Sequence, residues 1–237
     1  MNIALITAAG TGTRTHQIVP KQFLNVNDKP IIIYTMECFQ NHPEIDAIYI
    51  ACLDGWQGFV DLYAKQFNIT KLKKIVRGGD TGQKSIENVL EEIARDCSGD
   101  DIVLVHDGSR PYLPAQVITD NIRTCIEHGN GITAIDCKEA MLQTDDKIKS
   151  NISIDREILY RTQTPHSMYL KDMLALHDEA KEKGITGSVA TCTLLVECGH
   201  TVWFNRGSDL NFKITSKEDL LLFKALLVEQ DQQNWLK

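Results

Sequence analysis

Residues 1–14 read MNIALITAAGTGTR, and this stretch decides the fold class. Ile3–Thr7 is a short, continuous apolar run, and small residues and glycines follow it directly. A short apolar run that ends in a glycine turn is typical of a buried strand in a parallel sheet. No Lys or Arg precedes the run and Gly10 ends it early, so the segment does not have the pattern of a signal peptide.

The same alternation of short apolar runs and longer amphipathic stretches continues along the chain. It predicts further strands at residues 45–52, 73–76, 101–106, 131–137 and 201–204. It predicts helices at residues 30–39, 58–67, 81–94, 114–128, 170–182, 188–198 and 217–229. Strands separated by helices form βαβ units, so we expect an α/β fold with a mostly parallel sheet and helices on both faces. Such sheets bind ligands at the carboxyl ends of their strands.

Residues 138–160 interrupt this alternation. The segment is polar and has a turn centred on Thr144–Asp146, which favours a protruding β-hairpin arm over another βα unit. No repeat, low-complexity linker or proline-rich hinge divides the chain, so we expect residues 1–237 to form a single domain with this arm. A lone two-stranded hairpin is marginal in water, and an identical arm from a second subunit is the symmetric way to cover it.

Composition excludes several classes of function. The 237-residue chain has a net charge of −7 and a pI of about 5.5, which argues against a dedicated nucleic-acid binder. No apolar run approaches the roughly 18 residues of a membrane helix. The seven cysteines are loosely spaced and form no CxxC pair, which argues against a disulfide framework or a zinc site. They favour reduced thiols in a cytoplasmic protein.

The first candidate binding motif is the glycine loop at residues 7–14, followed by Pro20-Lys21-Gln22. Small residues after a strand let backbone N–H groups approach a phosphate chain, and Arg14 and Lys21 add the charge that a triphosphate needs. The spacing matches neither GxGxxG nor a P-loop. The alternative interpretation is a plain glycine turn with two surface cations.

The second motif, His106-Asp107-Gly108-Ser109-Arg110-Pro111, ends the most apolar strand. A carboxylate at the carboxyl end of a strand suits a divalent metal that bridges phosphates. Alternatively, Asp107 caps the following turn, and His106 alone is more often structural.

Two weaker motifs follow along the chain. Residues 77–85, RGGDTGQKS, form a glycine loop that opens a helix at Thr81, where free N–H groups can hold an anion or a base edge. In residues 211–215, NFKIT, Thr215 or the adjacent Ser216 can cap the last helix. Helix capping does not explain Lys213, a cation placed just before the helix start.

Together these segments resemble the cytidylyltransferases that act on sugar-alcohol phosphates. AAGTGTR (8–14), PKQF (20–23), HDGSRP (106–111), Arg156 with Thr164-Pro165, and NFKIT (211–215) occur in the family's order, and the resemblance runs from residue 3 to about 225. One branch of the family makes CDP-methylerythritol for isoprenoid synthesis, and the other makes CDP-ribitol for teichoic acid or capsule. PKQFLNVNDKPIIIYTMECF (20–39) is most similar to the ribitol-phosphate branch.

The resemblance implies a Rossmann-like fold whose arm crosses into the second subunit of a homodimer. It implies CTP and a polyol phosphate as substrates, magnesium as cofactor, and no nucleic-acid or membrane partner. The implied catalytic residues are Arg14, Lys21 and Lys213. The implied nucleotide-binding residues are Ala8, Ala9, Gly10, Gly12, Gly79, Asp80, Ser85 and Arg110. Arg156 and Thr164 are implied to bind the acceptor, and Asp107 the metal, with Asp209 as a second metal candidate.

The sequence departs from the family's pattern at several positions. Thr7 stands where the family has Leu, Gly82 where it has Arg, Ala140 where the arm has Thr, and His166 where a TPQ motif ends in Gln. Val189-Ala190 replaces a Thr-Asp pair, and Leu210 replaces an Asp that can precede the NFKIT motif. Most of these positions lie on the acceptor side, so the nucleotide is inferred more firmly than the acceptor.

The implied reaction is nucleotidyl transfer, in which the acceptor's phosphate oxygen attacks the α-phosphorus of CTP and pyrophosphate leaves. A methylerythritol phosphate acceptor stays open as an alternative to ribitol 5-phosphate. So do a UTP- or GTP-dependent enzyme acting on a sugar 1-phosphate, and a degenerate binding protein, which Gly82, Ala140 and Ala190 motivate. An NAD-dependent oxidoreductase is disfavoured by the incomplete glycine pattern.

Overall fold

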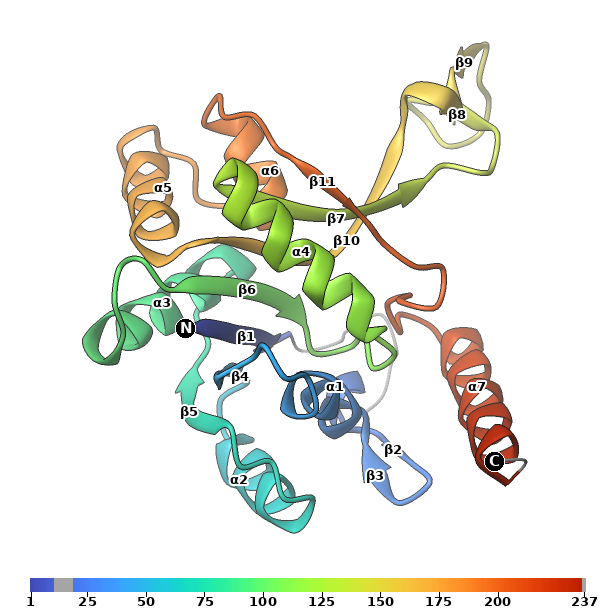
Figure 1. Ribbon diagram of the computed structural model, residues 1–237. Coiled ribbons are helices and arrows are strands. Elements are labelled where there is room, and N and C mark those ends of the chain that lie inside the picture. The colour runs from blue at the N-terminus through green and yellow to red at the C-terminus, as the bar shows by residue number, and fades with distance from the viewer. Residues whose placement is uncertain (11–18, 236–237) are drawn as a thin grey trace.

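The computed structural model describes residues 1–10 and 19–235, with side chains up to residue 229 (Figure 1). The strands of the central sheet are β1 (Asn2–Ala8), β4 (Ala47–Cys52), β5 (Leu72–Arg77), β6 (Ile102–Asp107), β7 (Asn130–Asp136), β10 (Tyr160–Tyr169) and β11 (Phe204–Arg206). The helices are α1 (Ile31–Gln40), α2 (Gln57–Gln66), α3 (Gly82–Asp96), α4 (Ala115–His128), α5 (Leu170–Glu182), α6 (Thr191–Glu197) and α7 (Lys217–Trp235). Two short hairpins, β2 (Asn25–Val26) with β3 (Lys29–Pro30) and β8 (Met141–Gln143) with β9 (Ile152–Ile154), lie outside the sheet.

The sheet order is β11-β7-β10-β6-β1-β4-β5. β10 runs antiparallel to both of its neighbours, and every other pair of adjacent strands is parallel. The predicted α/β fold class is therefore confirmed. The strands that follow one another through helices bring their carboxyl ends to one edge of the sheet, as the sequence pattern implied.

Helices cover both faces of the sheet because the central strands bury side chains on both sides. In β1, Ala4 and Ile6 pack in a cluster with α1, α2 and α4, whereas Ile3 and Leu5 pack in a cluster with α3, α5 and α6. Side chains alternate between the faces of a strand, so one continuous apolar run supplies both layers. Among the described residues, no helix has both the length and the apolar character that a membrane span requires.

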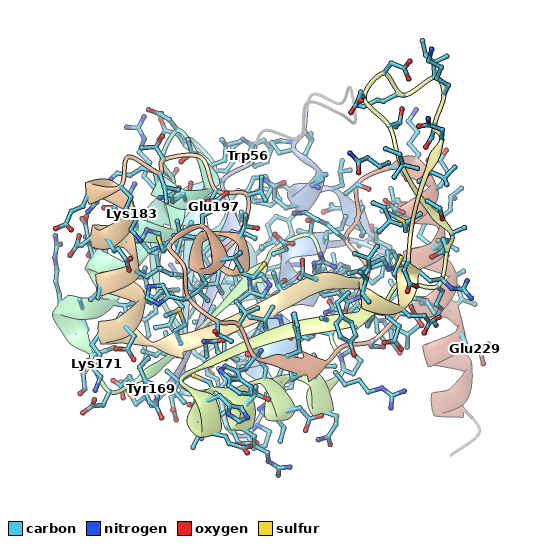
Figure 2. All side chains as sticks on the ribbon, turned by 90° about the horizontal axis from the view of Figure 1, so that it is seen from above. Trp56, Tyr169, Lys171, Lys183, Glu197 and Glu229 are labelled. Carbon is cyan, nitrogen blue, oxygen red and sulfur yellow. The ribbon has the colours of Figure 1, made fainter. Side chains whose placement is uncertain are left out.

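The arm projects from the sheet beside β7 and β10 (Figures 1 and 2). Its tip is the β8–β9 hairpin, and the turn at residues 144–149 is held by Asp146, whose Oδ1 accepts hydrogen bonds from the backbone N–H groups of Ile148 and Lys149. The predicted hairpin is thus present, and β10 carries the chain from the arm back into the sheet.

The strands predicted from the sequence differ from the structure in three places. The sequence-based prediction omitted β10, placed the last strand at 201–204 where the structure has β11 at Phe204–Arg206, and missed the β2–β3 hairpin. β10 was missed because its buried positions include Thr164, His166 and Ser167, which are polar and give no apolar run. Ser167 is satisfied inside the sheet, where its hydroxyl donates to the backbone oxygen of Asn121.

Candidate active site

A cavity of about 840 Å³ opens where β1, β4, β5 and β6 end. The loops after these strands, the middle of β10, and the first turns of α3 and α6 form its walls. The predicted site residues that line it are Ala8, Ala9, Gly10, Lys21, Gly79, Asp80, Ser85, Asp107, Arg110, Thr164 and Lys213. Gly12 and Arg14 lie outside the described residues. The fold therefore gathers sequence segments some 200 positions apart into one cavity.

Gln22 holds the start of the glycine loop. Its buried side-chain amide donates to the backbone oxygens of Ala8 at 2.9 Å and Gly10 at 2.8 Å. Both carbonyls are drawn toward Gln22. Lys21, the neighbour of Gln22, lines the cavity. The sequence motif that contains Gln22 gives no sign of this role, because only the fold brings the amide against the loop.

The second glycine loop, residues 78–81, packs directly against the first. A Cβ atom on Gly78 would lie 2.3 Å from the Cβ of Ala9, so this position requires glycine for close approach. The Ser85 hydroxyl accepts a hydrogen bond from the Gly79 N–H at 3.0 Å and donates to the Thr81 carbonyl at 2.8 Å. Thr81 in turn caps α3 through Lys84 N–H. Ser85 thus shapes the loop as well as lining the cavity.

Asp107 lies between two cations. Lys213 Nζ is 3.1 Å from its Oδ1, and Arg110 Nε is 3.0 Å from its Oδ2. Burial by itself would raise the pKa of Asp107, but the charges of Lys213 and Arg110 hold that pKa well below its ordinary value. The carboxylate is therefore ionised at neutral pH, and it keeps both cations at the cavity.

A hydrogen-bond chain behind Asp107 connects β6 to β10. The Asp107 N–H donates to Thr164 Oγ1 at 3.0 Å, and Thr164 Oγ1 is 3.0 Å from His106 Nδ1. His106 Nε2 lies 3.2 Å from the Arg110 carbonyl, which can only accept, so Nε2 carries the proton and Nδ1 accepts from Thr164. Burial lowers the pKa of His106 to about 4, which keeps the ring neutral. His106 is thus structural, and it orients Thr164 and Arg110.

Asn211 attaches the segment before α7 to this cluster. Its backbone oxygen accepts from Arg110 at 2.7 Å, and its buried side-chain amide donates to the Thr164 carbonyl at 2.7 Å. Two residues later, Lys213 reaches the cavity. These contacts are separate from the capping of α7. They hold the segment before the helix against the cavity, which explains why a lysine stands at this position.

Arg156 and Asp209 lie outside the cavity lining. Arg156 is on the arm, where its guanidinium donates to the Lys138 carbonyl at 2.7 Å. Asp209 is exposed and pairs with Lys138 at 2.5 Å and Arg161 at 3.6 Å. Asp209 thus lies at the base of the arm and is not among the residues that line the cavity with Asp107; its role as a second metal ligand stays a prediction.

Asp107 is the predicted metal ligand that lines the cavity. No cluster of three or more His, Cys, Asp or Glu side chains suited to a metal occurs in the part of the chain that the structure describes. Magnesium is commonly held by one or two carboxylates together with substrate phosphates and water. The donor set therefore fits a magnesium ion that binds with a polyphosphate.

Comparisons with known proteins agree with this geometry. The family model described as "IspD: 2-C-methyl-D-erythritol 4-phosphate cytidylyltransferase" matches residues 2–229. The ribitol-5-phosphate cytidylyltransferase of Lacticaseibacillus paracasei is 40% identical over 233 residues, which cover 98% of this chain and 100% of that protein. The 2-C-methyl-D-erythritol 4-phosphate cytidylyltransferase of Clostridium botulinum is 33% identical over 227 residues, covering 95% of this chain and 97% of that protein.

A solved structure is similar over nearly the whole chain. The crystal structure of 2-C-methyl-D-erythritol 4-phosphate cytidylyltransferase from Francisella tularensis superimposes with a TM-score of 0.76 at 27% identity, covering 93% of this chain and 97% of that one. Sequence motifs, cavity and likeness thus lead to the same conclusion: the chain belongs to the IspD family of cytidylyltransferases.

Proposed function

We propose that this chain transfers the CMP group of CTP to ribitol 5-phosphate, giving CDP-ribitol and pyrophosphate. The observation that carries the proposal is the ionised Asp107 carboxylate with Lys213 and Arg110, close to the glycine loop and to Thr164. Lys213 and Arg110 lie between the glycine loop, which would bind the triphosphate, and the Thr164 hydroxyl, which would face the acceptor. Cations in that position can neutralise the charge of two phosphates that are being joined. The 40% identity to a ribitol-5-phosphate cytidylyltransferase supports this acceptor, and methylerythritol 4-phosphate is the alternative.

The reaction needs alignment and charge neutralisation more than acid–base chemistry. An oxygen of the acceptor's phosphate forms a bond to the α-phosphorus of CTP. The bond from that phosphorus to the oxygen bridging to the β-phosphate breaks, and pyrophosphate leaves with the electron pair. A phosphate monoester is already a competent nucleophile near neutral pH. Lys21 and Lys213, with Arg14 as a further candidate, stabilise the growing negative charge.

Magnesium is the proposed cofactor, and Asp107 is the residue that would hold it. When bound, it neutralises phosphate charge and orients the leaving pyrophosphate. Ala8, Ala9, Gly10, Gly79, Asp80 and Ser85 surround the nucleotide in this proposal. All seven cysteines are free thiols, which supports a proposed location in the reducing cytoplasm.

A homodimer completes the proposed site. The arm exposes large apolar side chains that one subunit alone leaves in water: Leu142, Ile148, Ile152 and Ile158. A second copy of the arm is the symmetric partner for such a surface. Arg156, which is on the same arm and does not line its own subunit's cavity, then binds the acceptor phosphate in the partner's cavity. The planar guanidinium group of arginine can bind a phosphate through two parallel hydrogen bonds.

Mixed dimers test the shared site. Arg156→Ala and Lys21→Ala homodimers should each be nearly inactive, because each lacks one part of every site. A purified mixed dimer has one site with both lesions and one with neither, so it should recover roughly half of the wild-type rate. Inactive mixed dimers, or a fully active monomer, would contradict the shared site.

The acceptor is tested directly. Pyrophosphate release is measured with CTP and magnesium against ribitol 5-phosphate, methylerythritol 4-phosphate, glycerol 3-phosphate and ribulose 5-phosphate, and again with UTP or GTP in place of CTP. Highest kcat/KM with CTP and ribitol 5-phosphate is expected. A preference for methylerythritol 4-phosphate selects the alternative, and no release with any pair would contradict enzymatic function.

A further inference from the structure

The cavity wall shared by β10 and α6 contains two buried polar atoms without partners. His166 Nε2 and Thr191 Oγ1 are both buried, and neither has a hydrogen-bond partner within the described parts of the chain. Both residues line the cavity. Native structures leave few buried polar atoms unpaired, because each has given up its hydrogen bonds to water. Two on one wall call for a common explanation.

Both residues lie on the same side of the sheet. His166 lies opposite Val105 in the antiparallel β10–β6 pair, so the two side chains share a face. Met168, two residues further along β10, packs in the same cluster as Leu194 of α6. Because side chains alternate along a strand, His166 faces the layer in which Thr191 begins α6.

The His166 ring offers a lone pair at Nε2. Burial lowers the pKa of His166 to about 4, so the ring is neutral at pH 7. A hydrogen bond to the Gln163 backbone raises the pKa of His166. A backbone group raises the pKa of a histidine when its carbonyl accepts from the ring, so this bond uses the ring N–H. The remaining nitrogen is therefore an acceptor. The Thr191 hydroxyl can donate and accept.

The wall lies on the acceptor side of the cavity. In the sheet, β6 separates β10 from β1 and β5, whose ends carry the two glycine loops. Asp107 and Arg110 both perturb the pKa of His166, so the wall adjoins the phosphate cluster. The remaining lining there includes Val105 and Leu194. An apolar wall with a few polar atoms suits a carbon chain that carries hydroxyl groups.

We propose that His166 and Thr191 form the wall that recognises the hydroxyl groups of the acceptor. Nε2 of His166 accepts a hydrogen bond from one hydroxyl of the alditol chain, and Thr191 Oγ1 pairs with another. The proposal rests on the proposed function and adds to it which residues of this chain determine acceptor specificity.

The test uses ribitol 5-phosphate and analogues that each lack one hydroxyl. Wild-type enzyme should lose at least about 10-fold in kcat/KM with the analogue that cannot pair with His166, since a site built to bind a hydroxyl rejects its absence. His166→Phe keeps a ring but removes the acceptor. It should raise the KM for ribitol 5-phosphate, leave the KM for CTP unchanged, and no longer discriminate against that analogue.

Two further variants make the test specific. His166→Gln supplies an acceptor oxygen and should restore the discrimination, which a merely structural role of the ring would not produce. Thr191→Val should remove discrimination at a different hydroxyl. Thr193→Val is the matched control, because it deletes a hydroxyl from the same helix at a residue outside the cavity lining. If His166→Phe does not fold, the discrimination measured with Thr191→Val and His166→Gln still tests whether these two residues recognise the acceptor's hydroxyl groups.

The outcomes separate the two proposals. Absence of pyrophosphate release by the wild-type enzyme with every acceptor overturns the function and the hydroxyl wall together. Turnover in which His166→Phe and Thr191→Val discriminate like wild type overturns the wall alone. A rise in the KM for CTP in place of the acceptor also overturns it, because the wall would then face the nucleotide.

Discussion

Asp107 determines the chemistry of the site at the scale of single residues. Its carboxylate holds Lys213 and Arg110 from opposite sides, and its N–H is bonded to Thr164. Its side chain therefore orients two cations, and its backbone N–H holds Thr164, a proposed acceptor-binding residue. Lys21 reaches the same cavity from the first loop. Substitutions at these residues should change turnover far more than stability, since they line the cavity rather than fill the core.

Asp107→Asn should abolish most activity together with the dependence on magnesium, while CTP still binds weakly. The amide keeps the size of the side chain but cannot hold a divalent cation or neutralise Lys213 and Arg110. Magnesium titrations of pyrophosphate release measure the effect, and Asp61→Asn, an exposed carboxylate on α2, is the control. A normal metal titration in Asp107→Asn would show that Asp107 only stabilises its turn.

Lys21→Ala should lower kcat by about two to three orders of magnitude, comparable with the loss of one strong transition-state donor. The free energy of unfolding should change little. Lys65→Ala, which removes an exposed lysine of α2, serves as control and should keep the wild-type rate. A near-normal rate in Lys21→Ala would be incompatible with its role on the triphosphate.

At the scale of elements, α7 positions Lys213 through the way it begins. Ser216 Oγ accepts from the Asp219 N–H, and Asp219 Oδ2 accepts in return from the N–H groups of Ser216 and Thr215. This reciprocal capping box fixes the entry of the chain into the helix. Ile214 N–H also bonds the Ser109 carbonyl, so the segment that carries Lys213 is held at both ends.

Asp219→Ala should therefore affect stability and catalysis together. Loss of the capping box should lower the free energy of unfolding by about 1 kcal/mol. A looser start of α7 should also lower kcat/KM, because Lys213 is less well oriented. Chemical unfolding and steady-state kinetics measure the two effects, with the exposed neighbour Lys217→Ala as control. Reduced stability with unchanged kinetics would show that the cap does not position Lys213.

At the scale of the whole molecule, buried histidines couple stability to pH, above all His106 and His166. Burial lowers the pKa values of His106 and His166 to about 4, whereas histidine in an unfolded chain has a pKa near 6.5. Between these values the unfolded state binds more protons than the folded state. The contribution to stability is thus fully present above pH 6.5 and is lost as the pH falls toward 4.

The free energy of unfolding should accordingly fall between pH 6.5 and 4, by up to about 1.4 kcal/mol per pH unit for each of the two rings. Asp107 does not contribute in this window, because its lowered pKa matters only below the ordinary value of about 3.9. Urea unfolding at pH 7.5, 6 and 5 measures the slope. His166→Gln should reduce the slope, and an unchanged slope would contradict the assignment.

Much of the fold was predictable because its central strands are continuous apolar runs. Ile3–Thr7 and the run at residues 101–106 appear in the structure as β1 and β6, and the alternation with helices implied the parallel sheet and the edge where ligands bind. The motifs at residues 7–14, 20–23, 77–85, 106–111 and 211–215 together supply more than half of the described residues that line the cavity. Those signals are local, since residue type and spacing within a few positions carry them.

Other features were decided only by the tertiary structure. β10 gives no apolar signal, because its buried polar side chains find their partners on other strands and helices. Several side chains have roles that depend on groups far away in the sequence, such as carbonyls, hydroxyls and cavity walls. These side chains are Gln22, Asn211, His106 and His166. The sequence by itself determined most of the elements and the sheet edge at which the site forms. Hydrogen-bond partners and orphaned polar atoms depend on how those elements pack, and no local pattern records that packing.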